Sequence, residues 1–105
     1  MVEVTWTHRA RKDLDAIIAF IAESSPYYAQ RTEVGILERT LVLEVHPLIG
    51  HPVQELKDPG IREIAYGSYR IIYWVAAPDR LSVITVVHGK RRVTRTAIRS
   101  RLSLE

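Results

Sequence analysis

Two neighbouring segments of this chain are apolar on almost every residue, and they constrain its fold more than any other feature. The segments 69–75 and 81–87 are rich in the β-branched and aromatic residues that β-strands prefer. Strands that lack a polar–apolar alternation are covered on both faces of their sheet. Pro78 and Asp79 form a turn between the two segments. We therefore expect a hairpin in a sheet that carries structure on each face.

Two more strands flank this hairpin in the sequence. Residues 3–6 alternate between polar and apolar, which places Val2, Val4 and Trp6 on one face of a strand. Residues 61–66 form a third strand signal, and Gly67 with Ser68 supplies a tight turn into the strand that follows. The chain therefore has one N-terminal strand and a three-stranded meander.

Between these parts the hydrophobic spacing is that of helices. A stripe of apolar residues predicts an amphipathic helix that begins at Thr7 or His8: Ala10, Leu14, Ile17, Ile18 and Ile21. Ser25 is the expected N-cap of a second helix, with Pro26 at its first position and its end near Val45. Gly35 should weaken the middle of that helix by about 1 kcal/mol relative to alanine. The short connection predicts an antiparallel helical hairpin.

The expected order is β-α-α-β-β-β, an α+β fold in which the helical hairpin packs on a small, mainly antiparallel sheet. Two prolines and a glycine in residues 46–52 predict an irregular loop before the meander. After Gly89, the apolar residues Val93, Ala97, Ile98 and Leu102 permit a short third helix. The 105 residues suit a single domain over 1–105. Leu104 and Glu105 are either native or a remnant of cloning.

Several classes of protein are excluded by what the sequence lacks. Without cysteine there is no disulfide framework, thiolate nucleophile or cysteine zinc site. No run approaches the roughly 18 apolar residues of a membrane span, and the N-terminus has no apolar signal segment, so we expect a cytoplasmic protein. His46 and His51 have no carboxylate beside them to complete a metal shell. Phosphate-cradling motifs are absent, so we expect neither a metal nor a cofactor.

Charge is distributed unevenly along the chain. Residues 1–58 carry 6 basic and 9 acidic side chains, whereas residues 59–105 carry 9 basic and 3 acidic ones. Six of the basic residues gather in the C-terminal segment 89–105: Lys90, Arg91, Arg92, Arg95, Arg99 and Arg101. Such a segment suits a polyanion or an acidic protein partner, although a solvated basic tail would have the same composition.

The order of elements and six sequence pieces together resemble the RelE/ParE superfamily of bacterial toxins. The pieces begin with Trp6 and the Ala10-x-x-Asp13-Leu14-x-x-Ile17-x-x-Phe20-Ile21 pattern of the first helix. The others are Pro26-x-x-Ala29, His46-Pro47-x-x-Gly50-x-Pro52-Val53, Arg62-Glu63, Tyr69-Arg70-Ile71-Ile72-Tyr73 and Val87-His88-Gly89-Lys90-Arg91-Arg92. The resemblance implies a toxin with an antitoxin partner. Members of this superfamily act either on DNA gyrase or on messenger RNA in the ribosome.

RNA cleavage without a metal needs groups that bind the phosphate and groups that transfer protons. By resemblance, Arg70, Arg91 and Arg62 would bind phosphate, and His88 could act as acid or base. RelE-like nucleases also carry a second lysine where this chain has Ile64, and a C-terminal tyrosine, whereas no tyrosine follows Tyr73 here. These departures favour a ParE-like gyrase inhibitor over a ribosome-dependent endoribonuclease. Arg70 could instead pair with Glu63 across the hairpin.

The resemblance further implies a ParD-like antitoxin with an acidic or amphipathic segment. Phe20, beside the core stripe of the first helix, and Tyr27 and Tyr28, at the hairpin tip, could receive an amphipathic helix. These aromatics could equally seal the hairpin edge. Arg91 and Arg92 would attract acidic antitoxin residues.

Overall fold

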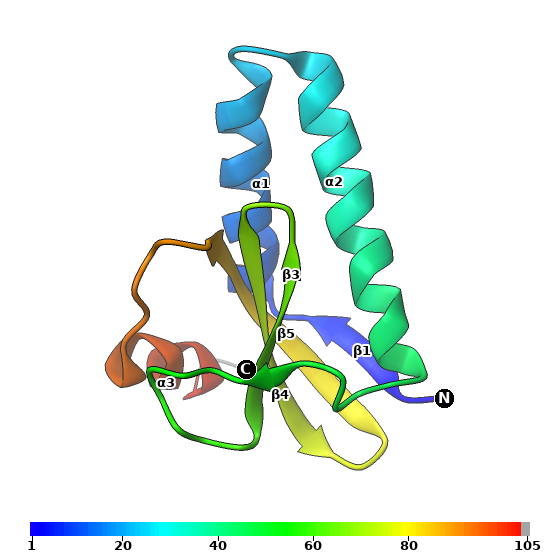
Figure 1. Cartoon of the computed structure of the whole chain (residues 1–105), viewed down its shortest axis with the longest axis vertical. Helices are drawn as coiled ribbons and strands as arrows, with labels where there is room; N and C mark the ends of the chain where they lie inside the picture. Colours follow the sequence, from blue (N-terminus) through cyan, green and yellow to red (C-terminus); the bar gives the residue numbers. More distant parts are fainter. Residues whose placement is uncertain (104–105) are drawn as a thin grey trace.

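The computed structural model describes residues 1–103, so Leu104 and Glu105, of undecided origin, lie outside the described residues (Figure 1). Its elements follow the order β1 (Glu3–Trp6), α1 (His8–Ala22), α2 (Pro26–Leu41), a 3-10 turn η1 (Val42–Glu44), β2 (His51–Pro52), β3 (Ile61–Tyr66), β4 (Tyr69–Ala77), β5 (Arg80–His88) and α3 (Arg95–Ser103). The expected α+β class and the short third helix are confirmed. Among residues 1–103, no helix combines the length and apolar character needed to cross a membrane.

The five strands form one sheet in the order β1-β5-β4-β3-β2. The pairs β5–β4, β4–β3 and β3–β2 are antiparallel, and only β1 runs parallel to its neighbour β5. A β-bulge interrupts the β4–β5 pairing, since Ile72 lies opposite Thr85 whereas Tyr73 lies opposite Val83. The extra residue, Ile84, is turned toward the face of the sheet that Ile72 occupies, and both belong to one core cluster.

Each face of the sheet carries its own hydrophobic core, as the apolar strands predict. On one face the α1–α2 hairpin contributes Ala10, Leu14 and Ile36, and η1 contributes Leu43, which pack on Ile64, Ile71, Tyr73, Leu81, Val83 and Val86 of the sheet. On the opposite face, Val53 and Leu56 of the 53–60 loop and Val93 and Ile98 of the C-terminal segment form a cluster with the strand residues Ile61, Ile72, Ile84 and Val87. The α1–α2 hairpin extends beyond one end of the sheet, and α3 lies beside the lower part of the sheet in this view (Figure 1).

The helix starts follow the predicted capping chemistry. The Thr7 hydroxyl accepts a hydrogen bond from the Ala10 amide at 3.0 Å, so Thr7 and not His8 is the N-cap of α1. Ser25 caps α2 in the same way by accepting from the Tyr28 amide at 3.1 Å, with Pro26 at the first helical position. Both caps satisfy amides that a helix terminus leaves without an intrahelical partner.

Two expectations about the middle of the chain were wrong. The α-helix α2 ends at Leu41 instead of near Val45, because the backbone tightens into the 3-10 turn η1 over Val42–Glu44. The loop 46–52 is also not wholly irregular, since His51 and Pro52 pair with Glu63 and Arg62 as the edge strand β2. Proline is tolerated at this edge because its missing N–H is needed by no further strand.

Gly35 has a packing role that its low helix propensity does not reveal. A β-carbon at this position would lie only 2.0 Å from the hydroxyl oxygen of Tyr66 and 2.1 Å from the ring carbon that bears it. The glycine therefore lets the tip of the β3–β4 hairpin approach the backbone of α2 closely. Glycine lowers the helix propensity of α2 at this position, but it leaves the space in which the Tyr66 ring packs.

Candidate functional site

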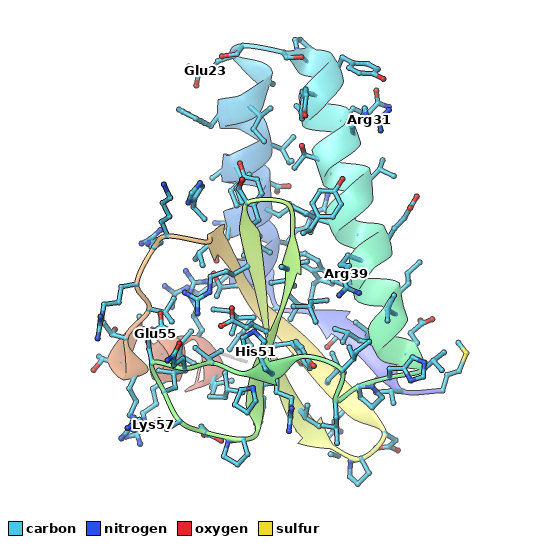
Figure 2. The ribbon with its side chains drawn as sticks, in the orientation of Figure 1. Glu23, Arg31, Arg39, His51, Glu55 and Lys57 are labelled. Carbon is cyan, nitrogen blue, oxygen red and sulfur yellow. The ribbon has the colours of Figure 1, made fainter. Side chains whose placement is uncertain are left out.

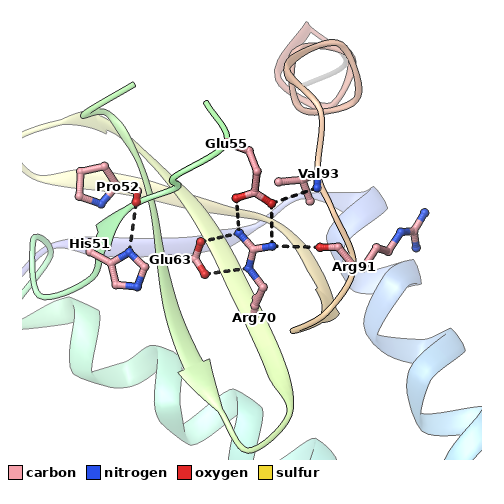
Figure 3. A network of polar contacts seen from close by, with 7 residues as sticks. All are labelled: His51, Pro52, Glu55, Glu63, Arg70, Arg91 and Val93. Carbon is pink, nitrogen blue, oxygen red and sulfur yellow. Dashed lines mark hydrogen bonds and ion pairs between the residues drawn. The ribbon is translucent and has the colours of Figure 1, made fainter. Parts of the chain in front are cut away.

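Arg70 lies at the centre of an ion-pair network in which all three nitrogens of its guanidinium take part (Figure 3). Its Nε and Nη2 donate to the two carboxylate oxygens of Glu63 at 2.8 and 2.6 Å. Its Nη1 and Nη2 donate to both carboxylate oxygens of Glu55 at 3.0 Å, and Nη1 also donates to the Arg91 carbonyl at 3.0 Å. All five N–H donors of a guanidinium are thereby engaged within the protein.

The network is enclosed, and it joins four parts of the chain. The side chains of Arg70, Glu55 and Glu63 are only 13, 18 and 10 % exposed. Glu55 also accepts a hydrogen bond from the Val93 amide at 3.2 Å. The 53–60 loop, β3, β4 and the segment that leads to α3 are thus joined to one another. Sequence analysis anticipated the pairing of Arg70 with Glu63, which the structure confirms, but not the partnership with Glu55.

Electrostatics within the network favour the charged forms of Glu55 and Arg70. The hydrogen bond from Arg70 lowers the pKa of the Glu55 carboxyl to about 2, assisted by the Val93 amide and opposed by burial. Glu63 first, and then Glu55, raise the pKa of the Arg70 guanidinium above its ordinary value. Burial raises the pKa of Tyr73, whose hydroxyl donates to the Pro47 carbonyl at 2.8 Å and accepts from the Gly50 amide at 3.1 Å.

The four residues proposed for RNA cleavage do not converge on one site. Arg70 lies opposite Val87 on β5, and it shares its sheet face with Glu63. Arg62 and His88 pair with Tyr73 and Tyr69, so they belong to the other face, where the helical hairpin packs. Alternation along the strands therefore separates Arg70 from both of them.

Each of these two residues has its own local partners. The Arg62 guanidinium donates to the Gly50 carbonyl at 2.7 Å, which ties β3 to the loop before β2. The exposed His88 ring meets Tyr69 edge-to-face, with ring centroids 5.9 Å apart, and its Nδ1 accepts from the Lys90 amide at 3.2 Å. His88 thus lies at the end of β5, where its polar contact is with the turn that follows.

A polar cleft of about 680 Å³ opens beside the Arg70 network. Its lining combines network residues with cations of the C-terminal segment: His51, Gln54, Glu55, Glu63, Arg70, Gly89, Lys90, Arg91 and Arg92. The structure therefore brings Arg91 to the same cleft as Arg70. Neither Arg62 nor His88 lines this cleft among the residues described.

A second hollow, the α1 groove, lies between α1 and the C-terminal segment and measures about 590 Å³. Its sides are formed by α1 residues Asp13, Ala16, Ile17 and Phe20 and by C-terminal residues Arg91–Thr94, Ala97, Ile98 and Arg101. Its floor consists of Tyr69 and Thr85–His88 at the ends of β4 and β5. The α1 groove thus joins an apolar floor to a basic rim.

A polar clamp holds the two sides of the α1 groove in place. Asp13 accepts from the Thr85 hydroxyl at 2.7 Å and forms an ion pair with Arg101 of α3 at 2.6 Å. Asp13 stands off the core stripe of α1, a position that marks it as polar-facing but gives no sign of its partner 88 residues away. Glu55 is a similar case, since nothing in the sequence shows that a loop glutamate will reach Arg70.

The predicted antitoxin-binding residues fall into two groups. Phe20, Arg91 and Arg92 line the α1 groove together, and Phe20 is 73 % exposed. Tyr27 and Tyr28 are also well exposed, yet they lie at the start of α2 and outside the groove. No group of three histidine or acidic side chains suited to a metal ion occurs among the described residues.

Comparison with known proteins identifies the family to which this arrangement belongs. Residues 4–93 match the family model described as the ParE toxin of the type II toxin–antitoxin system parDE. No curated protein matches the chain. Among solved structures, the fold is similar to a chain of the chromosomal ParDE TA system from P. aeruginosa, with a TM-score of 0.68 and 20 % sequence identity over 86 % of this chain and 98 % of that one. The match spans the first strand, the helical hairpin, the meander and the start of the basic segment, so the chain belongs to the ParE toxin family of type II toxin–antitoxin systems.

Proposed function

We propose that this ParE-family toxin arrests growth by binding and poisoning DNA gyrase, and that it does so without cutting RNA. The observation that carries the proposal is the state of Arg70. A phosphate-binding arginine must offer N–H groups to its ligand, whereas Arg70 donates all five to Glu55, Glu63 and the Arg91 carbonyl. Two carboxylates beside it would also repel a phosphate.

The placement of the remaining candidates supports the same proposal. Arg62 and His88 lie on the sheet face opposite Arg70, so these three side chains are not arranged around one scissile phosphate. The second lysine of RelE-like nucleases is replaced by Ile64 in this chain, and their C-terminal tyrosine has no counterpart, since no tyrosine follows Tyr73. These features favour a surface that binds a partner, with Arg91 and Arg92 at its basic edge, over a nuclease centre.

One observation favours the alternative, a ribosome-dependent endoribonuclease. The polar cleft places Arg91 near Arg70, together with Lys90, Arg92 and the imidazole of His51. An RNA phosphate could bind to the three exposed cations even while Arg70 stays paired. Under this alternative, alanine at Arg91 would abolish toxicity, whereas our proposal requires no single catalytic arginine.

We further propose that the cognate antitoxin neutralises the toxin by laying an amphipathic acidic segment in the α1 groove. Ile17, Phe20 and the apolar floor would receive the apolar side of such a segment, and Arg91 and Arg92 its acidic side. Tyr27 and Tyr28 lie outside the groove, so their part in antitoxin binding remains a prediction, which Tyr28→Ser would test. The family implies that an antitoxin partner exists, and we propose that the toxin and the antitoxin meet in the cytoplasm.

Purified gyrase provides the test of the proposed target. Full-length toxin added to gyrase, plasmid and ATP should block supercoiling and trap cleaved DNA, and added antitoxin should relieve both effects. Arg91→Ala should retain at least part of this activity, because inhibition of gyrase does not require the toxin to cleave a phosphodiester bond. Normal supercoiling in the presence of excess folded toxin would refute the gyrase proposal.

A further inference from the structure

The outer face of α2 carries an apolar stripe that is separate from the α1 groove. Tyr27, Val34 and Leu41 recur at seven-residue spacing, which keeps them on one side of a helix. They are 67, 47 and 56 % exposed. The buried residues of α2, namely Ala29, Thr32, Ile36 and Thr40, lie on the opposite side, so the stripe faces directly away from the core.

The charges beside this stripe are arranged symmetrically. Arg31 precedes Val34 by three residues and Glu38 follows it by four, so both lie on one flank of the stripe. Arg31 projects from the outer side of α2, away from α1 (Figure 2). Its guanidinium donates to the Tyr27 hydroxyl at 3.1 Å and stands 5.8 Å from the centre of that ring. The stripe is therefore bordered by one positive and one negative group at nearly equal distances from Val34.

Such a pattern is self-complementary when two copies of α2 run antiparallel. A two-fold axis near Val34 places this residue against its own copy, and it brings Tyr27 opposite Leu41 of the second copy. The same axis sets Arg31 beside Glu38 of the second copy, twice over. In a parallel two-fold pair, this flank of one copy lies on the opposite side of the interface from the same flank of the second copy, so Arg31 and Glu38 would not pair across it. A strongly acidic or basic partner would match only one of the two flanking charges.

We propose that the outer face of α2 is the interface of a symmetric homodimer of this chain, with the α2 helices packed antiparallel. The inference does not depend on the target of the toxin. Sixteen helical residues extend about 24 Å, and one helix pair buries less than the roughly 1,200 Å² of a stable interface. The dimer is therefore weak and in exchange with monomer, with a dissociation constant in the micromolar range or above. The α1 groove lies outside the α2 stripe and stays available to an antitoxin.

Sedimentation velocity of the full chain tests the interface. The wild type should shift from monomer toward dimer as its concentration rises from about 5 to about 200 µM, a range that spans the proposed dissociation constant. Val34→Asp should weaken the association at least about tenfold, because it buries a charge at the two-fold axis. Phe20→Asp is the matched control, since Phe20 is an exposed apolar residue outside the stripe and its replacement should leave the dimer unchanged.

Charge exchange tests the antiparallel register. Arg31→Glu and Glu38→Arg should each weaken self-association about tenfold, because each variant places like charges together across the axis. An equimolar mixture of the two variants should associate at least as well as the wild type, because both cross-axis pairs are then opposite in sign. Monomeric wild type at every concentration would overturn the proposal. So would a mixture that associates no better than either variant alone.

Discussion

At the scale of single residues, the guanidinium of Arg70 acts as a clamp that joins β3, β4, the 53–60 loop and the segment before α3. Its position on β4 makes the pairing with Glu63 predictable, because the two residues lie on neighbouring strands and the same face. The partnership with Glu55 is not predictable, because it depends on how an irregular loop of the chain folds back over the sheet. A sequence pattern that includes Arg70 therefore identifies the family but not the role of the residue.

Removing the clamp should be costly. Arg70→Ala leaves two enclosed carboxylates without their counter-ion, which typically lowers the free energy of unfolding by about 3 kcal/mol or more. The exposed Arg92 supplies the control, since Arg92→Ala should change that free energy by less than about 0.5 kcal/mol. Urea unfolding followed by circular dichroism measures both variants. An Arg70→Ala protein as stable as the wild type would mean that the network is not a clamp.

The same network predicts a dependence of stability on pH. In the folded chain the pKa of Glu55 is lowered from 4.5 to about 2, chiefly by the hydrogen bond from Arg70. A carboxyl whose pKa is lower in the folded state stabilises the protein fully above its unfolded value, and the stabilisation is lost as the pH falls through the folded value. The difference in unfolding free energy between wild type and Glu55→Gln should therefore shrink as the pH is lowered from 4.5 toward 2. A difference that is constant with pH would contradict this assignment.

At the scale of elements, most of the fold was predictable because local chemistry and tertiary packing agree. Thr7 and Ser25 cap their helices, and the Gly67-Ser68 and Pro78-Asp79 turns join β3 to β4 and β4 to β5. The edge strand β2 escaped prediction because its two residues are extended only through pairing with β3. The early end of α2 escaped as well, because nothing in the apolar spacing distinguishes an α-helical turn from a 3-10 turn.

The close packing of Tyr66 against α2 predicts the effect of a substitution at Gly35. Alanine in the interior of a helix is ordinarily about 1 kcal/mol more favourable than glycine. Here the new β-carbon would overlap the half-buried Tyr66 ring, and overpacking of this kind costs about 1–3 kcal/mol. Gly35→Ala should therefore destabilise the wild type, whereas in a Tyr66→Ala background the same substitution should stabilise by about 1 kcal/mol. Urea unfolding of the four proteins measures the sign in each background, and an unchanged sign would disprove the packing role.

At the scale of the whole molecule, the two hollows lie between segments that are distant in the sequence. The α1 groove needs the first helix and the last segment, which the Asp13–Arg101 ion pair holds together. Phe20, Arg91 and Arg92 could be proposed as contact residues from the sequence, because aromatics beside a core stripe and clustered cations can be recognised one at a time. It could not show that they share a groove, since that depends on the packing of α3 against the sheet.

Charge on the rim of the α1 groove should control antitoxin binding. Arg91→Glu/Arg92→Glu should weaken the antitoxin at least about tenfold at low salt, and the loss should shrink as salt screens the charges. Arg80→Glu/Arg99→Glu reverses two exposed cations outside the groove and is the control matched in charge. Isothermal titration at several salt concentrations gives the comparison. Equal losses from both variants would show that overall charge, and not the groove, attracts the antitoxin.

We propose that this ParE-family toxin stops growth without cutting RNA, with Arg70 as a clamp and no nuclease centre in the polar cleft. Mapping of RNA 5′ ends minutes after the toxin is induced without antitoxin tests this claim most directly. We predict intact messages at a time when growth has already stopped. New 5′ ends clustered within the codons of translated messages would rule out this proposal and make the chain a ribosome-dependent nuclease.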